Sequence, residues 1–465
     1  MFKQILDRLY QVPVLRPIIS DVHAQSHLYQ DYIRVAWPAT MQGLFMEVVT
    51  IVGLALVGAL GANALAAIAI MSQPKMVMLI FGRALGVAIT ALVARRKGAR
   101  DRERMNAVFH QGLLVAFLFY LPFLGLSYYF LEDILLVMGA QESFLAEGIL
   151  YGQYITVSVL FLMFSQIVGS ALIGVGNTKS IFFSNAVGNV VMALLSFVLI
   201  GGYLGMPAMG VAGAGLSALI GSIVTAVLIG GAVWGRDKEL SLLAKGWLFS
   251  RETLSSMSKI GVSSFGEQAF ERFGMVVYTM MVATLGAVPL ATHHVCMILL
   301  NLPYSFAIGL GQATTSHIGQ SLGQKRFDLA DTFGRIGHRI GIFMAIIAIV
   351  IYVIGREPLL LLFTREGDVV SLGTTLILIM AFAVIPQTLQ LVYSGILKGA
   401  GDNFYVMKYS LFVIAIFRPI FTYFLCFTLG MGIYGAWVSL VCDQSLRMIC
   451  AKYRVDQGKW KHIEI

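Results

Sequence analysis

The sequence contains few charged residues. Only 12% of its 465 residues are Asp, Glu, Lys or Arg, whereas 58% are hydrophobic. A soluble domain usually carries about 25% charged residues, so this composition excludes a soluble enzyme. The apolar residues exceed what one water-soluble core can bury, but they would fill about a dozen membrane helices of ~20 residues each.

Cysteine is scarce as well. The four cysteines lie within or at the ends of apolar runs, without the spacing of a zinc site or the density of a disulfide scaffold. The first thirty residues lack the continuous apolar stretch of a cleavable signal peptide. A Walker motif and a nucleophile-base constellation are also missing. These absences predict a protein without cofactors whose energy source is an ion gradient, with H⁺ or Na⁺ as the coupling ion.

Twelve apolar runs are long enough to cross a bilayer. They lie at about 33–60, 64–93, 107–130, 144–172, 181–204, 211–234, 259–285, 289–321, 332–354, 369–396, 404–428 and 433–450. Pro303 and Gly309 predict a bend or break in the eighth run. Most of the 33 lysines and arginines fall in loops on one side, whereas the other side carries only Arg356 and Arg365. The positive-inside rule therefore predicts a multi-pass protein of the inner (plasma) membrane with both termini cytoplasmic. Because the net charge of +9 follows these loops and forms no soluble patch, we expect no nucleic-acid partner.

The two halves of the chain repeat each other. A shift of 225 residues aligns Gly61 with Gly286, Gly98 with Gly323, and Gly176 with Gly401. Each half has six spans, so both enter the membrane in the same orientation. The predicted fold is an all-α integral membrane protein with twelve transmembrane helices in two parallel six-helix repeats. Its parts are a cytoplasmic segment (1–32), an N-lobe (33–234), a cytoplasmic linker with an amphipathic piece (235–258), a C-lobe (259–450) and a cytoplasmic tail (451–465).

Ionisable residues inside the spans are the first functional candidates, because each costs about 2.5–3.5 kcal/mol at the membrane centre. They are Glu47, Lys75, Arg83, Glu267, Glu271, Arg272 and Arg418. At ~1.5 Å per residue from the hairpin between them, Glu47 and Lys75 lie at one depth. They form either a structural ion pair or part of a transport site.

Glu271 differs from the other candidates because no basic residue lies at its depth on the following span. Asn301 and Tyr304 lie there instead. A carboxyl group desolvated in this way can load and release a proton near neutral pH. The alternative is a structural ion pair of Arg272 with Glu271 or with Glu267.

Several glycine-rich segments carry a family resemblance. They are LVGALGANALAAIAI after the first span, LIGVGNTKSIFFSNAVGN and GVAGAGLSALI across spans four to six, and SGILKGAGDN and GIYGAWVSLVCDQSLR across spans ten to twelve. With the twelve-span count, the sequence resembles the multidrug and toxic compound extrusion (MATE) family of the MOP superfamily over nearly the whole chain after residue 33. The resemblance implies export of organic cations or other amphipathic compounds by antiport against protons or sodium.

The family's functional positions are only partly present. Glu271 matches the glutamate of the seventh helix that many members use for cation coupling, but the aspartate position of the first helix holds Gly53. The acidic and amide positions of the fifth helix hold Met192 and Ser196, and the acid of the tenth holds Gln387. The resemblance thus implies a single coupling carboxylate in the C-lobe. A lone carboxylate with Gln387 suits a proton better than sodium, which needs several converging oxygen ligands.

The predicted ion-coupling residue is therefore Glu271. The candidates for the substrate cavity are Gln387, Glu47, Lys75, Arg83, Arg272, Tyr278, Asn301, Tyr304 and Arg418. The expected partners are the lipid bilayer and a small amphipathic or cationic substrate, and the protein is expected to be a monomer.

Three alternatives stay open at this stage. If the four basic candidates faced the cleft, a lipid-linked saccharide flippase of the same superfamily would be favoured, because they could hold a pyrophosphate. A major-facilitator carrier also has two six-helix halves, but the loop 95–106 lacks that family's signature. An intramembrane enzyme would need a catalytic pair at matched depth, and none is evident.

Overall fold

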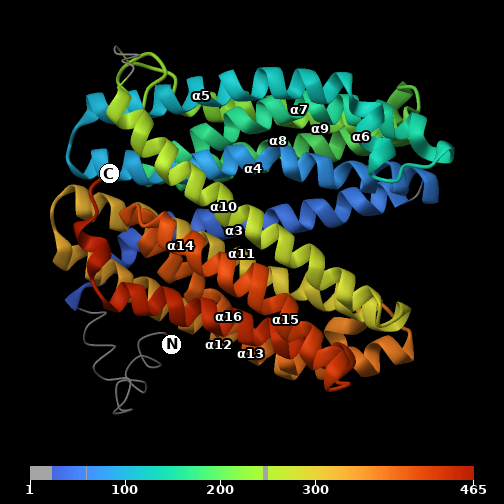
Figure 1. Cartoon of the computed structure of the whole chain (residues 1–465). Helices are drawn as coiled ribbons and strands as arrows, with labels where there is room; N and C mark the ends of the chain where they lie inside the picture. The colour runs from blue at the N-terminus through green and yellow to red at the C-terminus, as the bar shows by residue number, and fades with distance from the viewer. Residues whose placement is uncertain (1–23, 59, 245–249) are drawn as a thin grey trace, which may run out of the picture.

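The computed structural model describes residues 24–58, 60–244 and 250–465, which form long helices arranged in two bundles (Figure 1). The first repeat contains α3 (Ser26–Gly58), α4 (Ala62–Gly98), α5 (Arg102–Tyr129), the short α6 (Leu131–Val137), α7 (Glu142–Gly174), α8 (Thr178–Gly201), the 3-10 turn η1 (Tyr203–Gly205) and α9 (Gly210–Ala232). The second repeat contains α10 (Arg251–Ala283), α11 (Ala287–Gly323), α12 (Phe327–Leu361), α13 (Gly367–Ala400), α14 (Asn403–Ser410), α15 (Arg418–Tyr423) and α16 (Gly432–Asp456). A 3-10 turn, η4 (Lys459–His462), follows α16.

The twelve-helix layout in two repeats is confirmed. Among the described residues, nine helical segments are long and apolar enough to cross a membrane, and the remaining three spans are α3, α10 and α16. Charged residues lower the hydropathy of two of these three. Glu267, Glu271 and Arg272 interrupt α10, and Asp443 and Arg447 interrupt α16. These two less apolar spans thus carry several of the charged groups inside the membrane.

Helix irregularity lies in a different span from the one predicted. α11 runs without a break through Pro303, because neighbouring helices let a membrane helix tolerate proline. The eleventh span is the irregular one, since α14 and α15 are joined by the π-helical stretch η2 (Leu411–Phe417), and a second such stretch, η3 (Phe424–Thr428), follows α15. α10 approaches η2 so closely that a Cβ atom on Gly274 would lie 2.3 Å from the carbonyl oxygen of Ile414.

The first helix of each repeat crosses between the two bundles. In α3, Tyr29 and Tyr32 are buried in a cluster formed mainly by α11, α12 and α13 of the second repeat. In α10, Met257 and Ile260 belong to the large core of the first repeat, whereas the later Tyr278 packs with the second repeat. Figure 1 shows the diagonal course of α10 across the molecule. The two bundles therefore exchange their leading helices.

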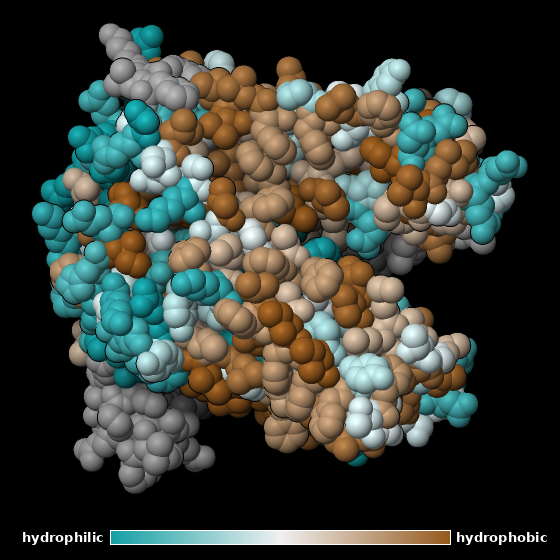
Figure 2. Space-filling view, viewed as in Figure 1, coloured by the Kyte–Doolittle hydropathy of each residue, from teal (hydrophilic) through white to brown (hydrophobic). Residues whose placement is uncertain are grey.

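The molecule is packed at one end and hollowed at the other. At the packed end α4 finishes in Arg95, Arg96 and Lys97; we call this the basic end. There α4 and α11 cross at the repeat-related Gly98 and Gly323, whose added Cβ atoms would lie 2.0 and 2.1 Å from backbone oxygens of the other helix. Figure 2 shows the cleft between the two halves at the opposite end, which we call the open end.

The predicted linker packs against the first repeat in its described part. Leu240 is buried in the core of that repeat, and the backbone N–H of Ser241 donates to Asn106 Oδ1 at 2.8 Å. The predicted amphipathic piece extends through 245–249, which lie outside the described residues.

Candidate functional site

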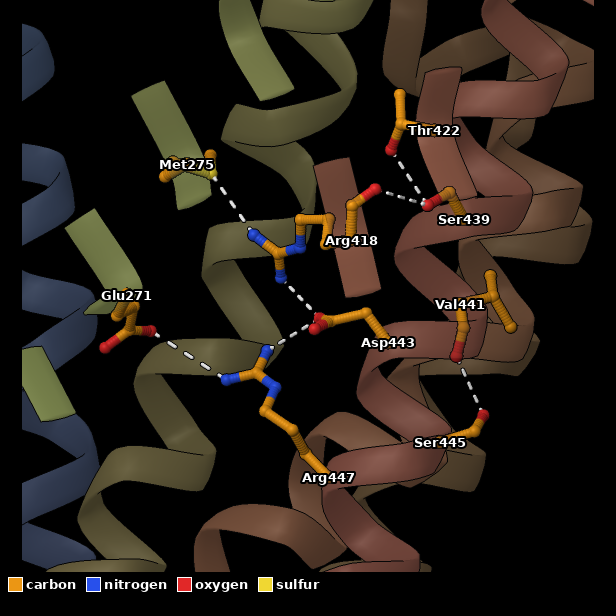
Figure 3. A network of polar contacts seen from close by, with 9 residues as sticks. All are labelled: Glu271, Met275, Arg418, Thr422, Ser439, Val441, Asp443, Ser445 and Arg447. Carbon is orange, nitrogen blue, oxygen red and sulfur yellow. Dashed lines mark hydrogen bonds and ion pairs between the residues drawn. The ribbon is translucent and has the colours of Figure 1, made fainter. Parts of the chain in front are cut away.

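A fully buried carboxylate, Asp443 of α16, lies at the centre of a polar network in the second bundle (Figure 3). Its Oδ2 accepts hydrogen bonds from Arg418 at the start of α15 and from Arg447 Nη2, one turn along α16, at 3.1 Å. Arg418 Nη1 also lies 3.8 Å from the sulfur of Met275 on α10. A buried charge is tolerated only when it is paired. Here two guanidinium groups pair with one oxygen of the carboxylate, whereas Asp443 Oδ1 has no hydrogen-bond partner among the described residues.

Glu271 of α10 joins this network through Arg447. Its Oε1 lies 4.0 Å from Arg447 Nη1, and 45% of its side chain is exposed, whereas Asp443 is completely buried. The guanidinium of Arg447 therefore lies between two carboxylates, as Figure 3 shows. The distance from this guanidinium to Asp443 is that of a hydrogen bond, whereas its distance to Glu271 is at the upper limit for an ion pair. Glu271 is thus the accessible carboxylate of the network.

Residues from both repeats surround Glu271. Tyr304 of α11 and Arg83 of α4 are close enough to interact electrostatically with Glu271, and Arg83 is also close to Arg272. Arg83 is exposed, whereas the next eleven residues of α4 are almost all buried, many of them in the core of the first repeat. Arg83 therefore marks the depth at which the exposed face of α4 ends.

The network is balanced in formal charge. Two carboxylates, Glu271 and Asp443, face two guanidinium groups, Arg418 and Arg447. The pair of Asp443 and Arg418 is buried in a medium of low dielectric constant, where charges interact more strongly than in water.

The predicted ion pairs of Arg272 are wrong. Glu267 pairs with Lys398 of α13 at 2.8 Å, and Glu271 lies near Arg447. Glu267 and Glu271 are four residues apart and so share one face of α10, whereas Arg272 is turned about 100° from that face. Among the described residues, Arg272 forms no ion pair, and its charge acts on that of Arg83.

The remaining candidates are more scattered. Tyr278 is buried with its ring 5.8 Å from Arg418 Cζ. Gln387 is buried in α13, and its Oε1 has no hydrogen-bond partner among the described residues. Asn301 is partly buried on α11 and Lys75 on α4. The side chain of Glu47 lies outside the described residues, so its predicted pairing with Lys75 stays a prediction.

Sequence reasoning missed Asp443 and Arg447. Arg447 lies near the end of the predicted twelfth span (433–450), next to the basic tail, but its side chain is only 7% exposed, and α16 continues to Asp456. Asp443 is a second carboxylate of the C-lobe in the same network as Glu271; that Glu271 is the single coupling carboxylate stays a prediction. The available signal was an aspartate inside an apolar run with an arginine four residues later, which is the spacing of an ion pair on one helix face.

One known protein family matches both repeats of the chain. The MatE family model matches residues 38–198 and again residues 264–424, once in each repeat. The chain belongs to the MATE family. Its membership shows a multi-pass membrane transporter.

Relatives of this MATE protein include annotated multidrug transporters. The Multidrug resistance protein NorM of Vibrio vulnificus (strain CMCP6) is 24% identical over 82% of this chain and 84% of its own length. The Uncharacterized transporter YisQ of Bacillus subtilis (strain 168) is 24% identical over 86% and 88%.

Solved structures share the fold. An outward-facing MATE transporter of the MOP superfamily superposes with a TM-score of 0.87 at 19% identity, covering 93% of this chain and 97% of its own. A MOP-superfamily transporter from Pyrococcus furiosus, described as having a binding pocket of reversed polarity, superposes with a TM-score of 0.86 at 18% identity, covering 94% and 97%.

Proposed function

We propose that this MATE transporter exports organic cations and other amphipathic drugs in exchange for protons, and that Glu271 is the group at which proton and cargo compete. The observation that carries the proposal is the contrast within one network: Asp443 is buried between two arginines, while Glu271 is 45% exposed and only 4.0 Å from Arg447. The proposal places the protein in the inner (plasma) membrane with both termini cytoplasmic, because the basic loops lie at one end.

The exchange follows from charge balance. Ionised Glu271 attracts a cationic drug into the cleft. A proton arriving from the open end neutralises that carboxylate and leaves the positive charge of Arg447 unopposed by it. The cation is then repelled and leaves. Return to a state open at the basic end releases the proton into the cytoplasm and restores the binding site.

The neighbours of Glu271 favour a proton over sodium as the coupling ion. A sodium ion needs several oxygen ligands that converge on one point. The nearest charged neighbour of Glu271 is a guanidinium, and the second carboxylate, Asp443, already accepts from two arginines. A proton needs only one accessible carboxylate oxygen.

Transport by the purified protein in liposomes tests the proposal. Glu271→Gln keeps the shape of the side chain but cannot exchange a proton, so movement of rhodamine 6G driven by a pH gradient is expected to fall to the level of empty liposomes. Glu366→Gln, an exposed carboxylate at the start of α13, is the matched control and should transport like wild type. Wild-type rates in Glu271→Gln, or transport driven equally by a sodium gradient without a pH gradient, would contradict the proposal.

A second candidate is export of anionic amphiphiles, including lipid-linked phosphates. It is favoured by Arg83 and Arg272, which belong to different repeats, act on each other electrostatically and make no ion pair among the described residues. Arg418 does not join them, because Asp443 holds it inside the bundle. Carboxyfluorescein and rhodamine 6G share a ring system but differ in charge. Preference for the anion, lost in Arg83→Gln, would support this second candidate over the first.

A further inference from the structure

A pocket opens between the two repeats at the basic end, far from the Glu271 network. It has a volume of about 500 Å³ and is lined by Arg34 of α3, Lys97 of α4, Lys179 of α8, His317 and Gln320 of α11, and Phe333 of α12. We call it the seam pocket, because its walls come from both repeats.

The polar groups at the back of the seam pocket are already engaged. Gln320 Nε2 donates to the carbonyl of Gly174 at 2.9 Å, and Lys97 Nζ donates to the carbonyl of Val175 at 2.6 Å and pairs with Glu239 at 3.1 Å. These bonds fix the end of α7 against α4 and α11. They leave the outer wall as the place where a ligand would find unsatisfied groups.

Two basic side chains on the outer wall have no such partners. Arg34 and Lys179 are both exposed, and within the described ranges neither forms an ion pair or a side-chain hydrogen bond. One acidic residue, Asp31, also lines the pocket. With Lys97 at the back, the lysine and arginine side chains outnumber the single aspartate, so the pocket attracts anions.

Two further features point to an oxyanion. α8 starts at Thr178 in the wall of the pocket. The Asn177 side chain already caps the N–H of Ser180, but the dipole and the other N–H groups at a helix start favour a negatively charged group such as phosphate. Nε2 of His317, which lines the pocket, is buried without a hydrogen-bond partner among the described residues. In the tautomer that carries its proton on Nε2, the neutral imidazole can donate one hydrogen bond to an anion at this position.

The position of the seam pocket in the membrane favours a lipid as the source of that anion. Leu28, Val35 and Leu329 join Phe333 as apolar lining residues beside the basic ones. On α3, the exposed Trp37 lies one turn from Arg34 toward the centre of the membrane, and tryptophan is enriched at the lipid–water boundary. A phosphate at Arg34 and an apolar chain beside Phe333 would therefore match the two halves of a phospholipid.

We propose that the seam pocket binds the phosphate group of an anionic phospholipid between Arg34 and Lys179. Because its walls belong to both repeats, the pocket is complete only while the basic end is closed. The lipid therefore stabilises the state that is open at the other end, since a ligand that binds one conformation shifts the population toward it. This inference does not depend on Glu271 or on the identity of the cargo.

Thermal unfolding of the full chain in detergent, with added lipid, tests the inference. Dioleoylphosphatidylglycerol should raise the Tm of the wild type more than dioleoylphosphatidylcholine does. In the double variant Arg34→Gln and Lys179→Gln, the phosphatidylglycerol concentration for half of the maximal shift should rise about tenfold or more, because charged hydrogen bonds are lost. The matched control is Arg251→Gln with Lys408→Gln, two exposed basic residues outside the pocket.

Each possible result supports or contradicts lipid binding in the seam pocket. Retention of the lipid effect in Arg34→Lys with Lys179→Arg, together with its loss in the glutamine variant, would support phosphate recognition by charge. An equal shift from sodium phosphate alone would overturn the lipid assignment and leave a site for free phosphate. Equal shifts from both phospholipids, or equal losses in the glutamine variant and the matched control, would overturn the site itself.

Discussion

The crossing of α4 and α11 at the basic end gives the most direct test of how the transporter closes. A methyl group added to Gly98 would meet the carbonyl oxygen of Gln320 at 2.0 Å, and one added to Gly323 would meet that of Arg95 at 2.1 Å. Both contacts are with backbone atoms of a packed helix, which cannot rotate away as a side chain could. Alanine at either position should therefore force α4 and α11 apart.

The magnitude follows from the cost of overpacking. An extra carbon atom in a well-packed contact typically costs 1–3 kcal/mol. The clash exists only while the basic end is closed, so this cost acts on the equilibrium between the two conformations. A penalty of about 2 kcal/mol shifts that equilibrium roughly 30-fold toward opening at the basic end. The double variant should shift it further, because the two glycines are related by the repeat.

Labelling of a cysteine at the contact between the two repeats measures this shift in the conformational equilibrium. Ser321 of α11 is almost fully buried in the closed end, so Ser321→Cys, in a background without the four native cysteines, should react slowly with a water-soluble maleimide. Gly98→Ala should accelerate labelling more than tenfold. Gly231→Ala on α9 is the matched control, because nothing lies within 4 Å of its added Cβ. Wild-type labelling in a folded Gly98→Ala variant would refute the closure mechanism, as would a lower Tm without faster labelling.

Two further substitutions test the packing around the site. Arg418→Met leaves Asp443 with only Arg447 as its partner; breaking a buried ion pair costs about 3–5 kcal/mol, so the Tm should fall sharply, and a Tm equal to that of wild type would contradict the assigned pairing. Tyr120→Phe removes a hydrogen bond donated to the carbonyl of Met78 (2.6 Å) and one accepted from the N–H of Gly82 (2.9 Å). It should cost roughly 1–3 kcal/mol, seen as a smaller drop in Tm, and an unchanged Tm would show that these bonds contribute nothing net.

Much of the fold could be predicted, because membrane helices appear as long apolar runs in the sequence. The glycines at 61 and 286 mark equivalent turns of the two repeats, and both have positive φ angles of 103° and 110°, a conformation that glycine adopts without strain. The repeat and the number of helices could therefore be predicted from the sequence. Hydropathy gives depth but does not identify neighbours, so the exchange of α3 and α10 between the bundles could not be seen in it.

The candidate site was predicted less completely for a related reason. Glu271 was found because an isolated carboxylate in an apolar run is conspicuous. Its partner Arg447 was missed because it lies near the end of its span, where an arginine in the membrane and an arginine in a basic loop have the same appearance in the sequence. Only the packing of α16 against α10 and α15 brings Arg447 between Glu271 and Asp443.

The exchange of leading helices bears on how the protein must be made. A chain ending before α10 would lack Met257 and Ile260, which complete the core of the first repeat, and its own Tyr29 and Tyr32 would have no cluster to enter. The first six spans therefore cannot reach their final packing while they leave the ribosome, and must wait for α10 to α13 to be synthesised. The two halves therefore reach their final packing in the membrane together and late in synthesis.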